Sequence, residues 1–181
     1  MKKITLITGN PGKVADVNRY IGFEIDHLDL DLPEIQSLSS REIVEEKVLV
    51  AYAKLGMPVL VEDVSFVIHS LGTLPGPFIK WFERSLGYEG ICRLLDGKDR
   101  ACTASVQYAY FDGERTIFSD GEMKGSVSHT PRGENSFGWG KIFIPNGMNR
   151  TYAELTDDEK SEFAMRKKAL FSLRKQLADV E

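Results

Sequence analysis

Short apolar runs alternate with amphipathic stretches through the first third of the chain, which is typical of an α/β fold. The apolar runs contain few polar positions, so the strands they predict are covered on both faces, as in a parallel or mixed sheet. Amphipathic spacing and a capping-box pattern predict two helices between these strands. The predicted order is a strand at 3–8, a helix at 13–21, a strand near 24–30, a helix from a cap at Ser39 to about Leu55, and a strand at 58–61 that ends at Glu62-Asp63.

The second half of the chain has a different pattern, in which long alternating stretches predict antiparallel strands. Proline and glycine are dense at 71–77, where the sequence predicts no regular structure. Strand material runs from Ala101 to about Ser128 around a hairpin turn at Asp112-Gly113. The remaining predicted elements are helices at about 78–86 and 88–95, a glycine-rich loop at 130–140, a short strand at 142–144, and one C-terminal helix capped at Thr156. No internal repeat or linker is visible, so residues 1–181 are predicted to form a single domain.

Composition and charge exclude several classes of protein. The 181 residues carry 23 Lys and Arg against 27 Asp and Glu, a net charge of −4, so no global basic field draws the protein to duplex nucleic acid. No window approaches the roughly 20 apolar residues of a membrane span, and the first apolar run is too short for a signal peptide. The two cysteines lack paired spacing, which favours reduced thiols and a cytoplasmic location, and the scattered histidines do not predict zinc.

A candidate phosphate site lies at the first junction between strand and helix. Thr8, Gly9 and Asn10 link the strand to a helix whose first turn carries Lys13. Backbone N–H groups at a helix start, together with one ammonium group, can bind an anion. The residues do not fit GxxxxGK[ST], so a standard P-loop is excluded, and an ordinary glycine turn remains the alternative.

Three carboxylates provide a candidate cation site. Glu62 and Asp63 follow the third strand, and Glu34 lies in a loop fixed by Pro33. Carboxylates beside a phosphate site repel the ligand unless a divalent cation lies between them, and Mg²⁺ prefers such oxygen ligands. Lys47, at the edge of the apolar face of its helix, either reaches the same region or extends its ammonium to water. Each acid alone is more simply a solvated loop end, but together they favour binding of a metal-bound polyphosphate.

Aromatic side chains in two segments rich in glycine and proline are candidates to contact a nucleobase. Lys80 stands between aromatic residues in the segment 74–82, and Phe137, Gly138 and Trp139 lie in the glycine-rich loop. A flat ring can stack on a base, although most Phe and Trp residues belong to the core.

Six motifs follow one another over nearly the whole chain. They are Thr8-Gly9-Asn10 with Lys13, Leu32-Pro33-Glu34, Leu60-Val61-Glu62-Asp63, Leu74 to Phe82, Phe137-Gly138-Trp139, and Thr151-Tyr152-Ala153-Glu154. In this order they resemble the motifs of the inosine triphosphatase family, the house-cleaning nucleoside triphosphate pyrophosphatases.

The resemblance implies a two-lobed α/β fold with a mixed sheet and helices around a central cleft, usually in a homodimer. It also implies Mg²⁺-dependent cleavage of non-standard purine nucleoside triphosphates, such as ITP, dITP and XTP, into the monophosphate and pyrophosphate. Carried over by position, Glu34 and Asp63 would hold the metal with Glu62 nearby, and Asp63 would polarise the attacking water. The expected substrate-binding residues are Thr8, Gly9, Asn10, Lys13, Lys47 and Lys80 for the phosphates, and Phe137, Gly138, Trp139, Lys160 and Arg166 for the remainder.

The chain departs from the family's motifs at positions that read the base. Gly140 stands where the family has Asp, and Ala164-Met165-Arg166 stands where it has Ser-His-Arg, whereas Lys160 and Arg166 are retained. A pocket discriminates between bases largely through buried polar groups that a wrong base leaves unpaired. The loss of three such groups predicts a broadened or shifted base preference.

Two other functions remain open at this point. One is a paralogue that binds nucleotides with weak turnover or none, and the other is a scaffold that uses the loop at 130–140. The presence of Glu34, Lys47, Asp63 and Lys80 favours the enzyme.

Overall fold

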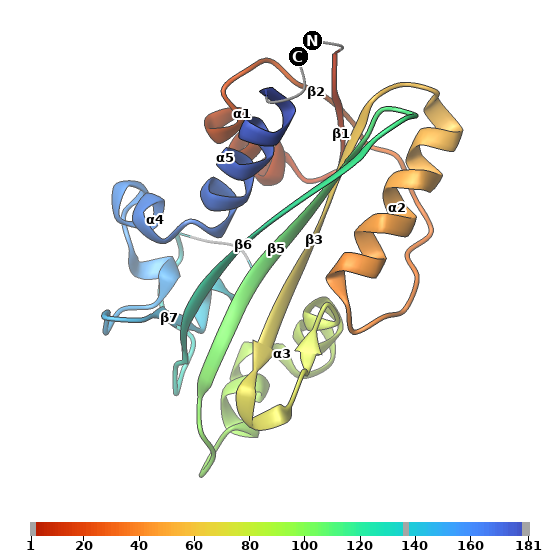
Figure 1. The fold of residues 1–181 in the computed structure, drawn as a ribbon. Helices are drawn as coiled ribbons and strands as arrows, with labels where there is room; N and C mark the ends of the chain where they lie inside the picture. Colours follow the sequence, from red (N-terminus) through yellow and green to blue (C-terminus); the bar gives the residue numbers. More distant parts are fainter. Residues whose placement is uncertain (1–2, 136–137, 179–181) are drawn as a thin grey trace. The chain divides into compact units, whose positions relative to one another are not determined.

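The computed structural model describes residues 3–135 and 138–178, which form a mixed sheet and five α-helices (Figure 1). The strands are β1 (Thr5–Ile7), β2 (Asp26–Leu28), β3 (Val59–Ile68), β4 (Pro75–Gly76), β5 (Ala101–Phe111), β6 (Thr116–Val127) and β7 (Phe143–Pro145). The α-helices are α1 (Pro11–Ile21), α2 (Ser40–Leu55), α3 (Ile79–Leu94), α4 (Asp157–Phe163) and α5 (Met165–Ala178), and the 3-10 helices are η1 (His69–Leu71), η2 (Gly138–Lys141) and η3 (Tyr152–Glu154). None of these helices is long and apolar enough to cross a membrane.

The seven-stranded sheet has the order β2-β1-β3-β5-β6-β7, with β4 paired to β3. β1 is parallel to both neighbours, and Leu6 lies opposite His27 of β2 and Leu60 of β3. β3 with β4 and β6 with β7 are antiparallel. The mixed α/β sheet confirms the fold class expected from the hydrophobic pattern.

The chain forms two compact units, each assembled from separate segments. Unit 1 comprises Met1–Asp63, Val106–Gly121 and Met165–Glu181, and unit 2 comprises Val64–Ser105 and Glu122–Ala164. Three strands, β3, β5 and β6, therefore contribute residues to both units.

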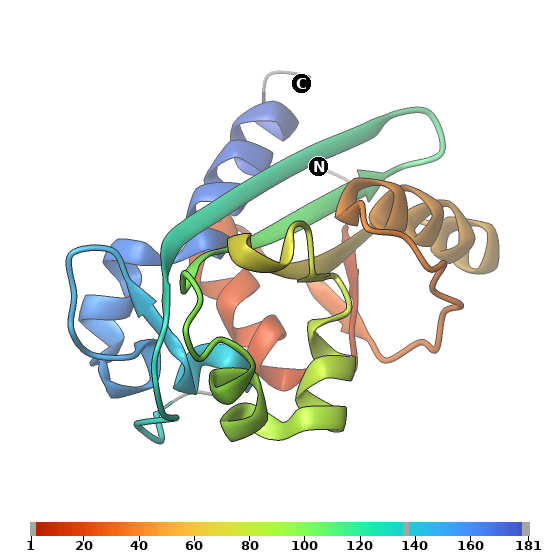
Figure 2. The ribbon, with the colours of Figure 1, turned by 90° about the horizontal axis from the view of Figure 1, so that it is seen from below.

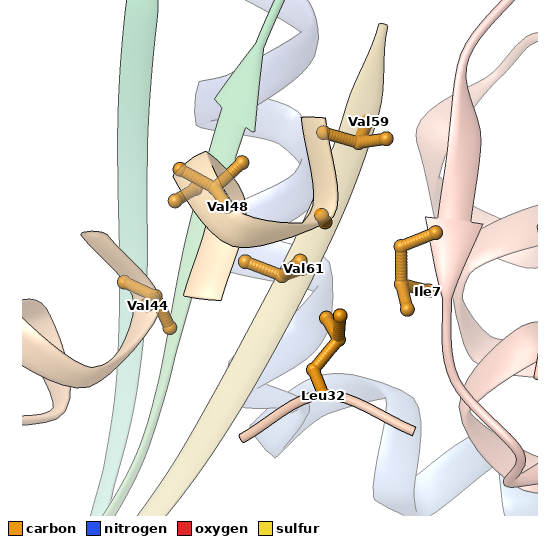
Figure 3. Close-up of a cluster of buried hydrophobic side chains, with 8 residues drawn as sticks. Ile7, Leu32, Val44, Val48, Val59 and Val61 are labelled. Carbon is orange, nitrogen blue, oxygen red and sulfur yellow. The ribbon is translucent and has the colours of Figure 1, made fainter. Parts of the chain in front are cut away.

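In unit 1, the apolar face of α2 packs on β1 and β3 (Figure 3), and α1 packs along α5 (Figures 1 and 2). The cluster under α2 consists of Ile7, Leu32, Val44, Val48, Ala51, Val59, Val61 and Ala109. Full burial of one such aliphatic side chain contributes about 1.5–3 kcal/mol. Because Leu32 is part of this cluster, the loop that carries Glu34 is anchored on the core.

In unit 2, α3 contains the two predicted helical segments and lies against η2 (Figure 2). The segments meet at Gly87, whose backbone is not helical, with φ 66° and ψ 172°. Glycine adopts this positive φ without the clash that a Cβ would cause. The kink confirms the two separate helical patterns predicted around residue 87.

The prediction that the third strand ends at Glu62-Asp63 is wrong. β3 continues to Ile68, because Val64–Ile68 keeps the β-branched and aromatic side chains that favour a strand, and Phe66 pairs with Gly76 of β4. β4 also corrects the prediction of no regular structure at 71–77, since proline is tolerated in a short edge strand. Glu62 and Asp63 thus lie within a strand, where consecutive side chains point to opposite faces.

The prediction of one C-terminal helix is also wrong. The Thr156 cap is confirmed, since Thr156 and Glu159 form a capping box, but α4 ends at Phe163 and α5 begins at Met165. Ala164 between them has φ −55° and ψ 108°. No Gly or Pro marks this break; Ala164 and Met165 are both buried, so tertiary packing overrides the local helix propensity.

Candidate functional site

Thr8 and Asn10 build the junction between β1 and α1. The Asn10 side chain caps α1 by accepting a hydrogen bond from the Gly12 N–H at 2.9 Å, and the Thr8 hydroxyl accepts one from the Asn10 N–H at 3.1 Å. Pro11 opens the helix at a position whose N–H has no partner within the helix. These bonds fix the backbone at the start of the helix that carries Lys13.

Glu62 is a buried anion held by two cations. Its side chain is 1% exposed, and the Lys13 ammonium lies 2.9 Å from its Oε1. Arg166 donates to both carboxylate oxygens, from Nη2 to Oε1 at 3.0 Å and from Nε to Oε2 at 3.2 Å. Burial raises the pKa of Glu62, but the charges of Arg166 and Lys13 outweigh burial and hold the pKa well below its usual range. Glu62 is therefore ionised, and both of its oxygens are engaged.

Arg166 connects three elements of unit 1. Besides Glu62 on β3, its guanidinium meets Asp16 on α1, with Nη1 3.5 Å from Oδ2. Burial lowers the pKa of Arg166, and the Glu62 charge and hydrogen bonds raise it above its usual range. The first residues of α5 are thus tied to both β3 and α1 through one permanently charged side chain.

Asp63, the next residue of β3, has a contrasting environment. Its Oδ2 atom is buried and has no hydrogen-bond partner in the described part of the chain. Burial raises the pKa of Asp63 to about 6; the Ser40 hydroxyl and the Lys47 charge lower it, and the Glu34 charge raises it. At pH 7 Asp63 is mostly ionised, and because the residue is only partly buried its carboxylate is suited to accept a cation or a proton.

Lys47 lies among these carboxylates. It forms an ion pair with Glu34, and its ammonium donates to the backbone carbonyl of Glu62 at 3.4 Å. The Glu34 side chain is 57% exposed, so one end of this pair faces solvent. Unit 1 therefore brings together six of the sequence-predicted site residues, namely Lys13, Glu34, Lys47, Glu62, Asp63 and Arg166.

The carboxylates of Glu34 and Asp63 fit a partly solvated Mg²⁺ ion. Mg²⁺ is usually bound through one or two carboxylates and completes its octahedral shell with water and phosphate oxygens. Among residues 3–135 and 138–178, no three His, Cys, Asp or Glu side chains gather into a metal cluster, so these residues supply no closed cage. The unpartnered Asp63 oxygen and the solvent-facing Glu34 carboxylate match the smaller ligand set that Mg²⁺ takes with a phosphate substrate.

Trp139 of unit 2 is held by other aromatic rings. Its ring centroid lies 5.2 Å from that of Phe66, 5.5 Å from that of Phe143 and 6.5 Å from that of Tyr152. The Glu83 carboxylate of α3 accepts a hydrogen bond from the Trp139 backbone, and burial raises the pKa of Glu83. Gly138 lies close to the same carboxylate, since a Cβ there would come within 3.4 Å of the Glu83 Oε1 atom. Trp139 is thus fixed within unit 2 by ring contacts and by one backbone bond.

The other predicted residues of unit 2 lie on two helices. Lys160 of α4 bonds to the Asn135 carbonyl and lies 5.6 Å above the Tyr152 ring, and Lys80 is exposed on the first turn of α3. Phe137 lies outside the described residues. The loop before Phe137 is therefore attached to α4 by Lys160 and Asn135.

The three departures from the family's motifs lie at buried positions. Gly140 is buried in η2, and Ala164 and Met165 are buried at the break between α4 and α5. A Cβ at Gly121 of β6 would collide with the Met165 carbonyl, so β6 and the start of α5 approach each other closely within unit 1. Met165 thus stands where α5 meets the sheet.

Sequence reasoning missed several neighbours of the site. Asp16 pairs with Arg166, and it follows Lys13 by one helical turn, which is a usable signal for a shared face. Ser40 lies beside Asp63 and directly after the predicted cap of α2. Asp29 lies against Gly9, where a Cβ would come within 2.5 Å of its Oδ1, and no sequence signal marks this contact.

Known proteins resemble this chain along almost its whole length. The sequence matches the Ham1 family over residues 4–176. It is 41% identical over 177 residues to an inosine triphosphate pyrophosphatase 2 of Trypanosoma cruzi, which covers 95% of this chain and 90% of that protein. It is 36% identical over 173 residues to a dITP/XTP pyrophosphatase of Methanopyrus kandleri, covering 93% and 92% of the two chains.

A solved structure shows the same fold. The structure of a HAM1 protein from Coxiella burnetii aligns with a TM-score of 0.84 at 25% identity and covers 99% of this chain and 100% of that one. The matched region at 4–176 contains all six motifs found in the sequence and the charged residues gathered in unit 1. The chain therefore belongs to the Ham1 family, which confirms the resemblance read from its motifs.

Proposed function

We propose that this protein hydrolyses non-standard purine nucleoside triphosphates, such as ITP, dITP and XTP, to the monophosphate and pyrophosphate. The named activities of its relatives in Trypanosoma cruzi and Methanopyrus kandleri support this assignment. The observation that carries it is the environment of Asp63, a carboxylate with a buried unpartnered oxygen and a pKa of about 6 beside Glu34 and Lys47. A desolvated anion of this kind lowers the stability of the fold, and it is useful where a proton or a cation must be accepted.

Asp63 accepts a proton from the water that attacks the α-phosphorus. A general base must be ionised to accept a proton, and in the metal-free protein a pKa of about 6 leaves Asp63 mostly ionised at pH 7. The attack forms a bond from the water oxygen to phosphorus and breaks the bond to the oxygen that bridges the α- and β-phosphates. That oxygen leaves with the pyrophosphate, and the proton stays on Asp63.

Lys13 and Lys47 bind the phosphate chain. An ammonium has three donors, so Lys13 can bond to Glu62 and still donate to a phosphate oxygen. Lys47, now paired with Glu34, would be available to phosphate if the Glu34 carboxylate held a cation instead. We propose Mg²⁺ as this cofactor, held by Glu34 and Asp63, where it would neutralise phosphate oxygens as negative charge moves to the pyrophosphate.

The remaining site residues stay predictions. They are Thr8, Gly9, Asn10, Lys80, Phe137, Gly138, Trp139, Lys160 and Arg166 as substrate-binding residues. The altered positions Gly140, Ala164 and Met165 support the proposal that base discrimination is broader than in relatives with polar groups there. A homodimer is a further expectation from the resemblance and a cytoplasmic location is one from the unpaired cysteines, and light scattering after gel filtration tests the first.

The decisive experiment measures pyrophosphate release from ITP, dITP, XTP and the common nucleotides with Mg²⁺. We expect turnover of ITP or XTP by the native protein, loss of turnover in Asp63→Asn, and retention in the control Asp112→Asn, which makes the same change at the hairpin tip of unit 1. The triple variant Gly140→Asp/Ala164→Ser/Met165→His is expected to narrow the preference towards ITP. Nucleotide binding without turnover of any nucleotide would contradict the proposal and identify a nucleotide-binding paralogue.

A further inference from the structure

The geometry points to Glu62 as a positioning residue that holds Lys13 ready for the phosphate chain, and not as a ligand of the metal. This inference rests on the proposed function and assigns different tasks to two consecutive acids of β3. Among the described residues one oxygen of Asp63 has no hydrogen-bond partner, whereas both oxygens of Glu62 accept hydrogen bonds.

The first support is that both oxygens of the Glu62 carboxylate are already bonded to cationic side chains. Oε1 receives both the Lys13 ammonium at 2.9 Å and the Arg166 Nη2 at 3.0 Å, and Oε2 receives the Arg166 Nε at 3.2 Å. The Glu62 side chain is 1% exposed and both of its oxygens are bonded, whereas Asp63 is only partly buried, so a hydrated cation has less access to Glu62 than to Asp63. A metal ion could bind there only after both partners had left, which would leave two cations without their buried anion.

The second support is the asymmetry between the two cations. The Arg166 side chain is 13% exposed and makes a two-pronged contact with Glu62 as well as an ion pair with Asp16, so it is fixed on both sides. The Lys13 side chain is 25% exposed and has a single contact to the same carboxylate. Arg166 therefore orients Glu62, and Glu62 in turn orients Lys13, the cation that still faces solvent.

The third support is the place of Lys13 in the chain. It lies in the first turn of α1, whose backbone is fixed by Thr8 and Asn10, but its four-carbon stem is flexible and loses much rotamer freedom on binding. Anchoring its ammonium on Glu62 before substrate arrives reduces this entropic cost. The anchor therefore acts on substrate affinity more than on the chemical step.

A double-mutant cycle between Glu62→Gln and Lys13→Ala tests this order of action. We expect Glu62→Gln alone to raise the KM for ITP about tenfold, the size of one lost charged hydrogen bond, with a small change in kcat. In the Lys13→Ala background the same substitution should have almost no further effect on KM, because the group through which Glu62 acts is gone. An equal effect in both backgrounds would overturn the inference.

Mn²⁺ binding, followed by electron paramagnetic resonance without nucleotide, separates the positioning role from metal ligation. We expect Glu62→Gln to bind Mn²⁺ as the native protein does, while Glu34→Gln and Asp63→Asn bind it more weakly. Weakening by Glu62→Gln to the same extent as by Asp63→Asn would make Glu62 a ligand and overturn the inference. Should Glu62→Gln fail to fold, Glu62→Gln/Arg166→Met removes both ends of the buried pair and is measured in its place.

These readouts also distinguish failure of the inference from failure of the proposed function. A native protein that turns over no nucleotide refutes the proposed activity, yet the cycle can still be measured on the dissociation constant of ITP. The control Asp112→Asn breaks the ion pair between Asp112 and Arg115, distant in sequence from Lys13, and is expected to change neither the KM nor Mn²⁺ binding.

Discussion

Candidate site residues are held by charges in unit 1 and by rings and backbone bonds in unit 2. In unit 1, Lys13, Arg166 and Glu62 form a buried ionic group, and Asp63 keeps an unpartnered oxygen. In unit 2, Trp139 is packed among aromatic side chains, and Gly138 lies close to Glu83. The ionic contacts of unit 1 determine which charged groups can meet a ligand. The ring contacts of unit 2 determine the shape of the surface around Trp139.

This difference predicts how each unit responds to substitution. Removing the charge of Asp63 in unit 1 alters the chemistry without leaving a cavity or an unpaired buried partner, whereas shortening the Trp139 ring in unit 2 leaves a cavity that lowers the free energy of unfolding. Activity and stability should therefore separate at Asp63 and change together at Trp139.

The largest expected effect is on turnover in Asp63→Asn. The amide cannot take the proton of the attacking water, so kcat should fall by about 10³-fold, a typical loss for a general base. Steady-state pyrophosphate release measures the change, with Asp112→Asn as the isosteric control. Residual turnover within tenfold of the native rate would assign the base to another residue.

Asp63→Asn should not lose stability, although it loses activity. The pKa of Asp63 is raised from 3.8 to about 6, so between these pH values the folded metal-free protein binds more protons than the unfolded chain. Asp63 therefore lowers the free energy of unfolding as the pH rises from about 4 to 6, and the penalty persists at pH 7. Because Asn is never ionised, the variant should be at least as stable as the native protein in urea at pH 7, and a clear loss would contradict this.

The sequence predicted the elements of the fold well because short-range signals determine them. Apolar runs at 3–8 and 58–61, the cap at Ser39 and the glycine near the α3 kink are local features. The end of β3 and the break at Ala164 were wrong because pairing with β4 and burial of Met165 decide them, and neither leaves a local mark.

The sequence predicted which residues belong to the candidate site, but not which of them form ion pairs with one another. Spacing and motif order pointed to Lys13, Glu34, Lys47, Glu62 and Asp63, all of which unit 1 gathers. The different environments of the two adjacent acids were not predictable, since they depend on Arg166, which lies 104 positions away in sequence. Alternation of side chains along a strand explains how neighbours can face such different surroundings.

The largest effect on stability is expected in unit 2 from Trp139→Ala. Loss of the ring leaves Phe66, Phe143 and Tyr152 without their common partner, and the free energy of unfolding should fall by about 3 kcal/mol. Trp139→Phe retains an aromatic contact and should cost about 1 kcal/mol. Urea denaturation measures the free energy of unfolding of both variants. If Trp139→Ala cost less than Trp139→Phe, the contacts with these three rings would not be what stabilises Trp139.

A smaller effect on stability is expected at Gly133, where the loop of unit 2 lies against backbone atoms of Ala153. Gly133 has φ 78°, and a Cβ there would come within 2.5 Å of the Ala153 carbonyl carbon. Gly133→Ala should therefore cost about 2–3 kcal/mol, from backbone strain and the collision together. Gly97→Ala is the matched control, because Gly97 has φ 74° but nothing within 4 Å of its Cβ position, and only the strain of about 1 kcal/mol should remain.

The smallest expected effects compare one helix cap in each unit. Thr156 and Glu159 at the start of α4 satisfy each other's backbone N–H groups, whereas Ser39 at the start of α2 accepts from the Glu42 N–H while the Glu42 carboxylate bonds to Ser37. Thr156→Ala should therefore cost about 1 kcal/mol and Ser39→Ala about 0.5 kcal/mol. Differential scanning calorimetry measures both. If Ser39→Ala lowers the free energy of unfolding more than Thr156→Ala does, the cap of α2 also supports the neighbouring Ser40, whose hydroxyl lies beside Asp63. The stability of unit 1 would then depend on the backbone around its site as well as on the charges there.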